Sequence, residues 1–233
     1  TPATTEAFAT YGTLEDGAMQ QPVDAPDDAW PQYGGLEVTT SSTQLQALTD
    51  ALLYLNGYRF ACTEQLASRV LANAALRDVL EAFEADQLPP PAAIEASVEG
   101  DLEQLARRQN RSGGFSYWGR DLDLPHASLH ALHAFIRARD KGFQVDDAVI
   151  ARRLQYASRI ERHIPRWYSD RARRSIRAYA LFVRHRAGDD DPARARKLYR
   201  EGLDALPLEA QAWILPVLHE AGASDEVAAI RRN

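Results

Sequence analysis

The fold is constrained most by a helical pattern that starts near residue 43 and continues to the end of the 233-residue chain. Apolar side chains recur every three or four positions, the spacing that places them on one face of a helix. Glycine or proline marks the junctions between segments, where these residues cap or stop helices. The pattern predicts about nine helices, near residues 43–57, 63–86, 94–105, 125–141, 146–162, 170–187, 192–205, 207–221 and 224–231.

Short loops join these predicted helices, so helices that follow one another in the chain become antiparallel neighbours. Each helix has one apolar face, which it must bury against other helices. We therefore predict an all-α fold of packed helical hairpins, with no sheet after residue 43.

Residues 1–42 differ from the rest of the chain. Thr4–Leu14 is rich in threonine and aromatic residues and predicts extended structure. Three prolines between residues 21 and 31 are typical of a linker, and Leu36–Thr40 is a candidate short strand. We divide the chain into an extended segment with a Pro-rich linker (1–42) and a helical domain (43–233).

Composition excludes several classes of function. The net charge is −6, and no basic stripe with interleaved aromatic residues is present, which argues against a nucleic-acid partner. No apolar run approaches the roughly 20 residues that a membrane span needs. The chain has one cysteine, so an internal disulfide is impossible.

That cysteine, Cys62, lies where a loop meets the start of the predicted helix 63–86. Cys62 and Gln65 are three residues apart, a spacing that puts two side chains on one helix face. A helix N-terminus favours the thiolate, which is the nucleophilic form of cysteine. The thiolate can attack the Gln65 amide carbon and release ammonia, which leaves an internal thioester. The plainer interpretation of a lone cysteine is a small buried hydrophobic residue.

Residues 62–65, Cys-Thr-Glu-Gln, resemble the Cys-x-Glu-Gln thioester motif of the alpha-2-macroglobulin and complement superfamily. Two segments agree with the bacterial members. Tyr33–Val38 (YGGLEV) resembles a segment that precedes their motif, and Gln109–Trp118 (QNRSGGFSYW) resembles their Gln-Asn-x-x-Gly-Gly-Phe-x-x-Trp turn. The resemblance covers most of the chain from about Tyr33 onward. One position differs, because Ala61 stands where the family usually has glycine.

The resemblance implies an α/α toroid, in which helical hairpins circle a common axis. The family's toroid is usually longer than this chain allows, so we expect an incomplete one, preceded by the end of a β-rich module. It also implies a periplasmic or cell-envelope inhibitor that captures proteases. A protease cuts a bait region elsewhere in the longer protein, and a lysine amine then attacks the Gln65 carbonyl while Cys62 leaves as a thiolate. This is single-use capture rather than enzymatic catalysis.

The resemblance names partners and further site residues as well. Expected partners are target proteases and other domains of the same longer chain, with no membrane contact, cofactor or metal. Glu64 is a candidate for polarising or orienting the thioester. His163 is a candidate because, in complement-type relatives, a histidine downstream of the thioester assists transfer to hydroxyls. The alternative for His163 is an exposed histidine in the basic stretch 159–166.

Other functions stay open at this stage. The thioester can tag surfaces by acylating hydroxyls, or the toroid can be a non-covalent binding module in which Cys62 never condenses. His126, His130 and His133 follow a helical spacing that can gather metal ligands. The alternative is that these histidines only pack or lie partly exposed. The acidic runs 121–123 and 189–191 suggest the Mg²⁺-pyrophosphate site of a terpene cyclase. The alternative is that their aspartates are ordinary turn residues.

Four aromatic residues lie near the motif in sequence or through the predicted turn: Tyr58, Phe60, Tyr117 and Trp118. A thioester must be shielded from water to survive. These side chains can contribute to a shield, or they can belong to the hydrophobic core.

Overall fold

The computed structural model describes residues 10, 12–14, 16–23, 30, 32, 35–36, 38, 40, 45–58, 60–82, 90–119 and 122–233. The chain divides into two units, Thr1–Thr43 and Gln44–Asn233. In the first unit the described residues form no helix or strand, and Leu36 and Val38 are exposed. The candidate strand 36–40 is therefore wrong at its described positions, and Glu37 and Thr39 lie outside the described residues.

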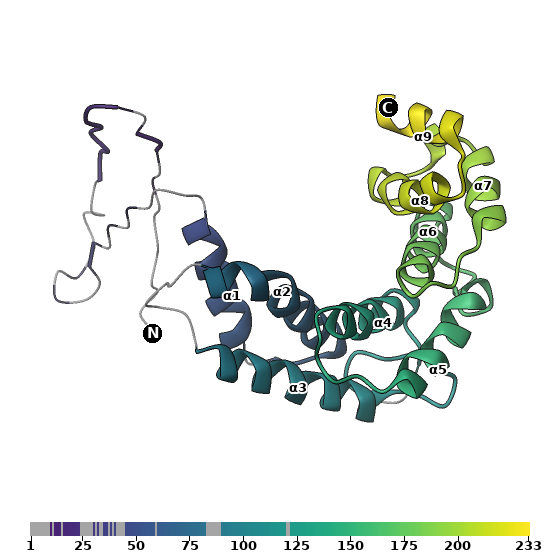
Figure 1. Cartoon of the computed structure of the whole chain (residues 1–233), viewed down its shortest axis with the longest axis horizontal. Helices are drawn as coiled ribbons and strands as arrows, with labels where there is room; N and C mark the ends of the chain where they lie inside the picture. Colours follow the sequence, from purple (N-terminus) through teal and green to yellow (C-terminus); the bar gives the residue numbers. More distant parts are fainter. Residues whose placement is uncertain are drawn as a thin grey trace. The chain divides into compact units, whose positions relative to one another are not determined.

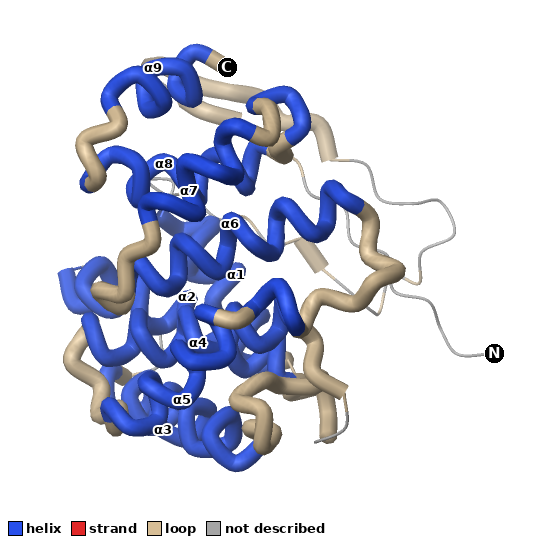
Figure 2. Tube along the Cα trace, turned by 90° about the vertical axis from the view of Figure 1, so that its right-hand side faces the viewer, coloured by secondary structure: helices blue, strands red, loops and turns tan. Residues whose placement is uncertain are grey.

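The second unit is helical throughout its described part, as the apolar spacing predicts. Figures 1 and 2 show helices joined by loops, with no strand among the described residues; the longest described loop joins α3 to α4. The helices are α1 (Leu45–Gly57), α2 (Thr63–Ala82), α3 (Pro91–Arg108), α4 (Pro125–Asp140), α5 (Asp147–Ser158), α6 (Asp170–Arg186), α7 (Pro192–Arg200), α8 (Leu208–Glu220) and α9 (Ser224–Arg232), with short 3₁₀ turns η1 (Ile160–Arg162) and η2 (Leu203–Ala205).

Local chemistry sets the helix boundaries. The Asp146 side chain accepts from the Ala148 N–H at the start of α5, and the Ser169 side chain accepts from the Ala172 N–H at the start of α6. Gly188 follows α6 with a φ of +79°, a conformation that costs other residues a steric penalty. Gly188 is one of the glycine and proline junctions on which the predicted boundaries rested, whereas the Asp146 and Ser169 caps were not part of that prediction. The predicted end of the second helix, residues 83–86, lies outside the described residues.

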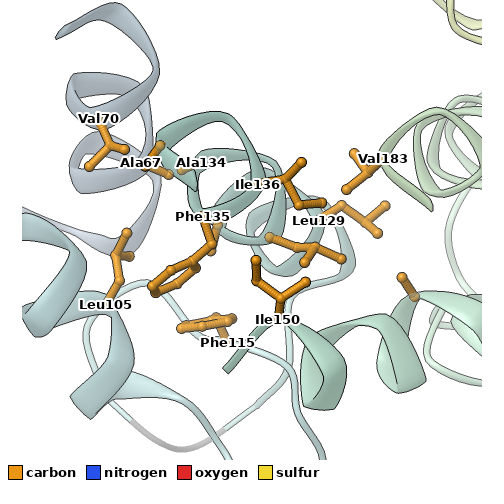
Figure 3. Close-up of a cluster of buried hydrophobic side chains, with 14 of the residues drawn as sticks. Ala67, Val70, Leu105, Phe115, Leu129, Ala134, Phe135, Ile136, Ile150 and Val183 are labelled. Atoms are coloured by element: carbon orange, nitrogen blue, oxygen red, sulfur yellow. The ribbon is translucent and has the colours of Figure 1, made fainter. Parts of the chain in front are cut away.

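Two hydrophobic clusters hold the helices together. The first gathers side chains from α2, α3, α4, α5 and α6, several of which Figure 3 shows packed around Phe115 and Phe135. The second joins α6, α7, α8 and α9. Helix α6 serves both, because Tyr179 and Val183 pack into the first cluster and Leu181 into the second. The all-α class and its hairpin arrangement are therefore confirmed for the described residues.

Contacts between helices link α2 to α8 in a series. Helix α2 packs on α3 and α4, α4 packs on α6, and α6 packs on α8. No helix in the described part of the chain is long and apolar enough to cross a membrane.

Candidate functional site

Cys62 directly precedes α2 and is buried, with 7% of its surface exposed. Its carbonyl accepts the first helical hydrogen bond, from the Leu66 N–H at 3.0 Å. Cys62 therefore occupies the N-cap position, where the unpaired N–H groups of the first turn favour a negative charge. Burial keeps the Cys62 thiol away from bulk water.

Gln65 folds back onto Cys62. The Gln65 Oε1 atom accepts a hydrogen bond from the Cys62 backbone N–H at 3.2 Å. This is the return contact of a capping box, in which the third helical side chain satisfies the N–H of the cap residue. The structure thus brings together the two residues that the motif predicts to react, while the thioester itself stays a prediction.

The turn 109–118 lies against the same helix end. The Tyr117 carbonyl accepts from the Thr63 N–H at 2.8 Å, which fills one of the donors left open at the start of α2. Inside the turn, the Asn110 N–H donates to the Gly114 carbonyl at 2.9 Å, and Gly113 has a φ of +93°. The two glycines of the motif-like segment are therefore part of what positions the cysteine.

Gly114 is required by space as well. A Cβ at this position would lie 2.6 Å from a ring carbon of Tyr156 and 2.7 Å from the Asp123 carboxyl carbon. The Asp123 carboxylate is held by the Asn110 amide at 2.6 Å. The next residue, Phe115, is fully buried and anchors the turn in the core.

The nearby aromatic side chains are largely exposed. Phe60, Tyr117 and Trp118 have 64%, 48% and 62% of their surface exposed, so the interpretation that places them in the core is wrong. Tyr58 is half-buried, and its ring lies 5.8 Å from that of Phe60. Their role as a shield of the cysteine stays a prediction.

Glu64 is held by a contact that the motif does not reveal. The Ser68 hydroxyl donates to Glu64 Oε1 at 2.9 Å, and His130 Nε2 on α4 lies 2.9 Å from the same hydroxyl. Ser68 lies one helical turn beyond Glu64, and that spacing is the one signal in the sequence that points to it. His130 comes from a helix 62 residues away in the chain, so no local pattern identifies this contact.

His130 and His133 share a tyrosine. The Nδ1 atoms of both lie 3.1 Å from Tyr179 Oη, which belongs to α6. Burial lowers the pKa of each histidine to about 4, with repulsion from His126 adding at His130 and repulsion from His130 adding at His133. Both rings are therefore neutral at pH 7, and burial raises the pKa of Tyr179.

His130 and His133, two of the three histidines considered as metal ligands, therefore have partners within the protein. His126, the third member, is exposed, and its ring stacks on that of His130 with centroids 5.9 Å apart. In the described part of the chain, three potential ligand atoms come within 4.8 Å of one another at His185, Asp190 and Glu220.

His163 lies in a different setting. Its ring stacks on Tyr156 with centroids 4.0 Å apart, and Nδ1 is 4.0 Å from the Asp123 carboxylate. Burial is the main cause that lowers its pKa, while Asp123 opposes the shift. His163 is partly buried rather than exposed, and it packs beside the residues that support the Gly113–Gly114 turn. Its part in acyl transfer stays a prediction.

The acidic run 189–191 is occupied by structural contacts. Asp189 and Asp191 both pair with the Arg184 guanidinium, and the Asp191 side chain caps α7 by accepting from the Arg194 N–H. These are the turn and cap roles that aspartate commonly fills beside glycine and proline. In the run 121–123, Asp121 lies outside the described residues.

Comparison with known proteins places this site in context. The chain is 34% identical over 102 residues to an alpha-2-macroglobulin of Xylella fastidiosa and 29% identical over 111 residues to one of Rickettsia conorii, matches that cover 43% and 46% of this chain. It is also 31% identical over 157 residues, 63% of this chain, to circularly permutated Ras protein 2 of Dictyostelium discoideum. The chain spans 4 to 6% of the length of these relatives. No protein-family model matches it.

Solved structures share the fold. Native alpha-2-macroglobulin from Escherichia coli, from domain MG7 to the C-terminus, superposes with a TM-score of 0.68 over 80% of this chain and 31% of that one, at 19% identity. Salmonella alpha-2-macroglobulin reacted with methylamine gives 0.60 over 79% of this chain and 12% of that one, at 21% identity. Trypsin-activated E. coli alpha-2-macroglobulin gives 0.63 over 76% and 13%, at 18% identity.

The structure is thus an α-helical domain in which a buried cysteine precedes a helix and a glutamine of that helix accepts from the cysteine N–H. The sequence matches and the shared fold relate the chain to the bacterial alpha-2-macroglobulins.

Proposed function

We propose that Cys62 and Gln65 condense to an internal thioester. The observation that carries this proposal is the return of the Gln65 side chain onto Cys62, with Oε1 3.2 Å from the Cys62 N–H. The Cys62 thiolate attacks the Gln65 amide carbon, the C–N bond breaks, and the amide nitrogen leaves as ammonia with the thiol proton. Holding both groups on one helix turn supplies much of the barrier reduction, on the order of 7–11 kcal/mol in favourable cases.

The same geometry suits the next step, in which the Gln65 acyl group is transferred from the Cys62 sulfur to an amine. A primary amine attacks the Gln65 carbonyl carbon, a C–N bond forms, the C–S bond breaks, and the amine proton ends on the sulfur of Cys62. Negative charge develops on the carbonyl oxygen during the attack. The Cys62 N–H already points at that oxygen and is positioned to stabilise the charge. The helix N-terminus stabilises the departing thiolate.

We assign this chemistry to covalent capture of proteases by a longer protein. The relationship to bacterial alpha-2-macroglobulins supports the assignment, and trypsin activated one of them in the solved structures. The partners are then an attacking protease, through its lysine amines, and the other domains of the longer chain. Each molecule reacts once, so the protein is a trap rather than an enzyme, and we place it in the periplasm or cell envelope.

Labelling with a fluorescent primary amine tests the acyl transfer. Folded protein should take up one label, located by peptide mass spectrometry at Gln65, with one thiol released at Cys62. Cys62→Ala should take up no label. It should still fold, because the substitution removes little buried volume. Gln104→Asn, a change at an exposed glutamine on α3, should label like the natural protein. Label that persists in Cys62→Ala would overturn the proposal.

Acceptor choice separates capture from surface tagging. A labelled alcohol offered in place of the amine reports on hydroxyl acylation. If His163 assists that route, His163→Gln lowers alcohol labelling while amine labelling is unchanged. Equal alcohol labelling in both proteins would remove His163 from the mechanism.

A further inference from the structure

A line of hydrogen bonds runs from Glu64 into the protein. It passes from Glu64 to Ser68 on α2, to His130 on α4, to Tyr179 on α6 and back to His133 on α4, with distances of 2.9, 2.9, 3.1 and 3.1 Å. The far end is closed by Trp213 of α8, whose ring stacks on Tyr179 at 4.5 Å. The line thus connects the motif with three other helices.

Hydrogen-bonding capacity fixes the direction of every bond in this line. An ionised Glu64 can only accept, so the single Ser68 proton points to it. The Ser68 oxygen must then accept from His130 Nε2–H, which leaves Nδ1 to accept from the Tyr179 hydroxyl. The Tyr179 oxygen in turn accepts from His133 Nδ1–H. These directions hold for neutral imidazole rings, the form that the burial of both histidines favours.

Glu64 stands at the open side of the motif. In the first turns of α2, Cys62, Thr63, Leu66 and Ala67 are buried, whereas Glu64 and Gln65 are only partly buried. The Glu64 side chain keeps 40% of its surface exposed. Successive helical residues are about 100° apart, so Glu64 and Gln65 flank the solvent face of the first turn. Solvent therefore reaches both the Glu64 carboxylate and the Gln65 side chain, which are neighbours in the first turn of α2.

We propose that Glu64 is the amine-recognition and proton-accepting residue of this site, and that Ser68 and His130 are its positioning residues. This inference rests on the proposed thioester. The carboxylate attracts a protonated amine and takes one proton from it. As the neutral amine attacks Gln65, a C–N bond forms and the C–S bond breaks. The second proton that the nitrogen loses ends on the Cys62 sulfur. A neutral nucleophile gains nothing from the charge of Glu64, so the residue selects for amines.

Two probes of different charge test this role. Methylamine is a cation at neutral pH, whereas hydroxylamine is mostly neutral. The release of the Cys62 thiol gives the rate with each. Glu64→Gln should slow methylamine by roughly tenfold or more and should slow hydroxylamine much less, so the ratio of the two rates falls. Glu64→Asp keeps the charge and should restore part of the ratio. Ser68→Ala and His130→Gln should lower the ratio by less than Glu64→Gln does.

The control is Glu95→Gln, which changes an exposed glutamate on α3 and should leave both rates unchanged. An unchanged ratio in Glu64→Gln, with the thioester present, overturns the inference and leaves the thioester proposal standing. An equal slowing of both probes also overturns it, because that result reports general damage to the site. Failure of the thioester proposal looks different, since the natural protein itself then releases no thiol with either probe.

Discussion

The paired histidines predict a specific acid sensitivity of the fold. Burial lowers the pKa of both His130 and His133 from 6.5 to about 4. In the unfolded chain both return to about 6.5. Between about pH 6.5 and 4, the two histidines therefore bind more protons in the unfolded state than in the folded state. The stability that these neutral rings contribute is complete above pH 6.5 and is lost as the pH falls through 6.5 towards 4.

The magnitude follows from the two pKa values. One pKa unit corresponds to about 1.4 kcal/mol, so full protonation of one such histidine lowers the free energy of unfolding by about 3 kcal/mol. Between pH 7.5 and 5.0 the loss is about 2 kcal/mol for each ring. Neighbouring charges act in both directions on the two rings, and burial outweighs them. At His130, His126 lowers the pKa and Glu64 raises it; at His133, His130, Arg186 and Arg137 lower the pKa and Asp140 raises it.

Urea denaturation followed by circular dichroism at pH 7.5 and 5.0 measures the loss. Carboxylates titrate in the same range, so the comparison is with His130→Gln, in which the fall between the two pH values should be smaller by about 2 kcal/mol. His219→Gln removes an exposed histidine on α8 and should fall as the natural protein does. An equal fall in the natural protein and in His130→Gln would refute the reasoning.

Three further substitutions test the packing by the same urea assay. Asp101→Asn should cost about 3–5 kcal/mol, because it leaves the Arg69 guanidinium without the carboxylate that joins α3 to α2; a loss below 1 kcal/mol would contradict this. Gly114→Ala should cost about 1–3 kcal/mol through the clash with Tyr156, and no loss would show that the turn yields easily. Arg153→Met should leave stability unchanged or raise it by about 1–2 kcal/mol, because two guanidinium nitrogens of this buried side chain have no hydrogen-bond partner. A loss above about 2 kcal/mol would mean that the contacts of the guanidinium with the Phe115 and Phe135 rings dominate.

Much of the fold was accessible from sequence because its signals are local. The apolar spacing located the helices, and glycines such as Gly188 marked their ends. The predicted helix 146–162 is divided in the structure, since α5 ends at Ser158 and a 3₁₀ turn follows. Periodicity does not distinguish such a tightened end from a continuing α-helix, because both place apolar residues three or four apart.

In the candidate site, contacts between residues close in sequence could also be predicted, whereas contacts between distant helices could not. The pairing of Cys62 with Gln65 follows from a three-residue spacing. The contact of His130 with Ser68 spans 62 residues and that of His133 with Tyr179 spans 46, so both depend on how α2, α4 and α6 pack. The exposure of Phe60, Tyr117 and Trp118 was missed because a large aromatic side chain usually belongs to a core.

The intact mass of the untreated protein tests the central claim most directly. A thioester between Cys62 and Gln65 predicts a mass lower than the sequence mass by one ammonia, and no thiol that titrates in the folded protein. Treatment with methylamine should then release one thiol and add one methylamine to the mass. Cys62→Ala should have its full sequence mass under all conditions. A natural protein of full sequence mass, with a titratable Cys62 and an unaltered Gln65, would contradict the account.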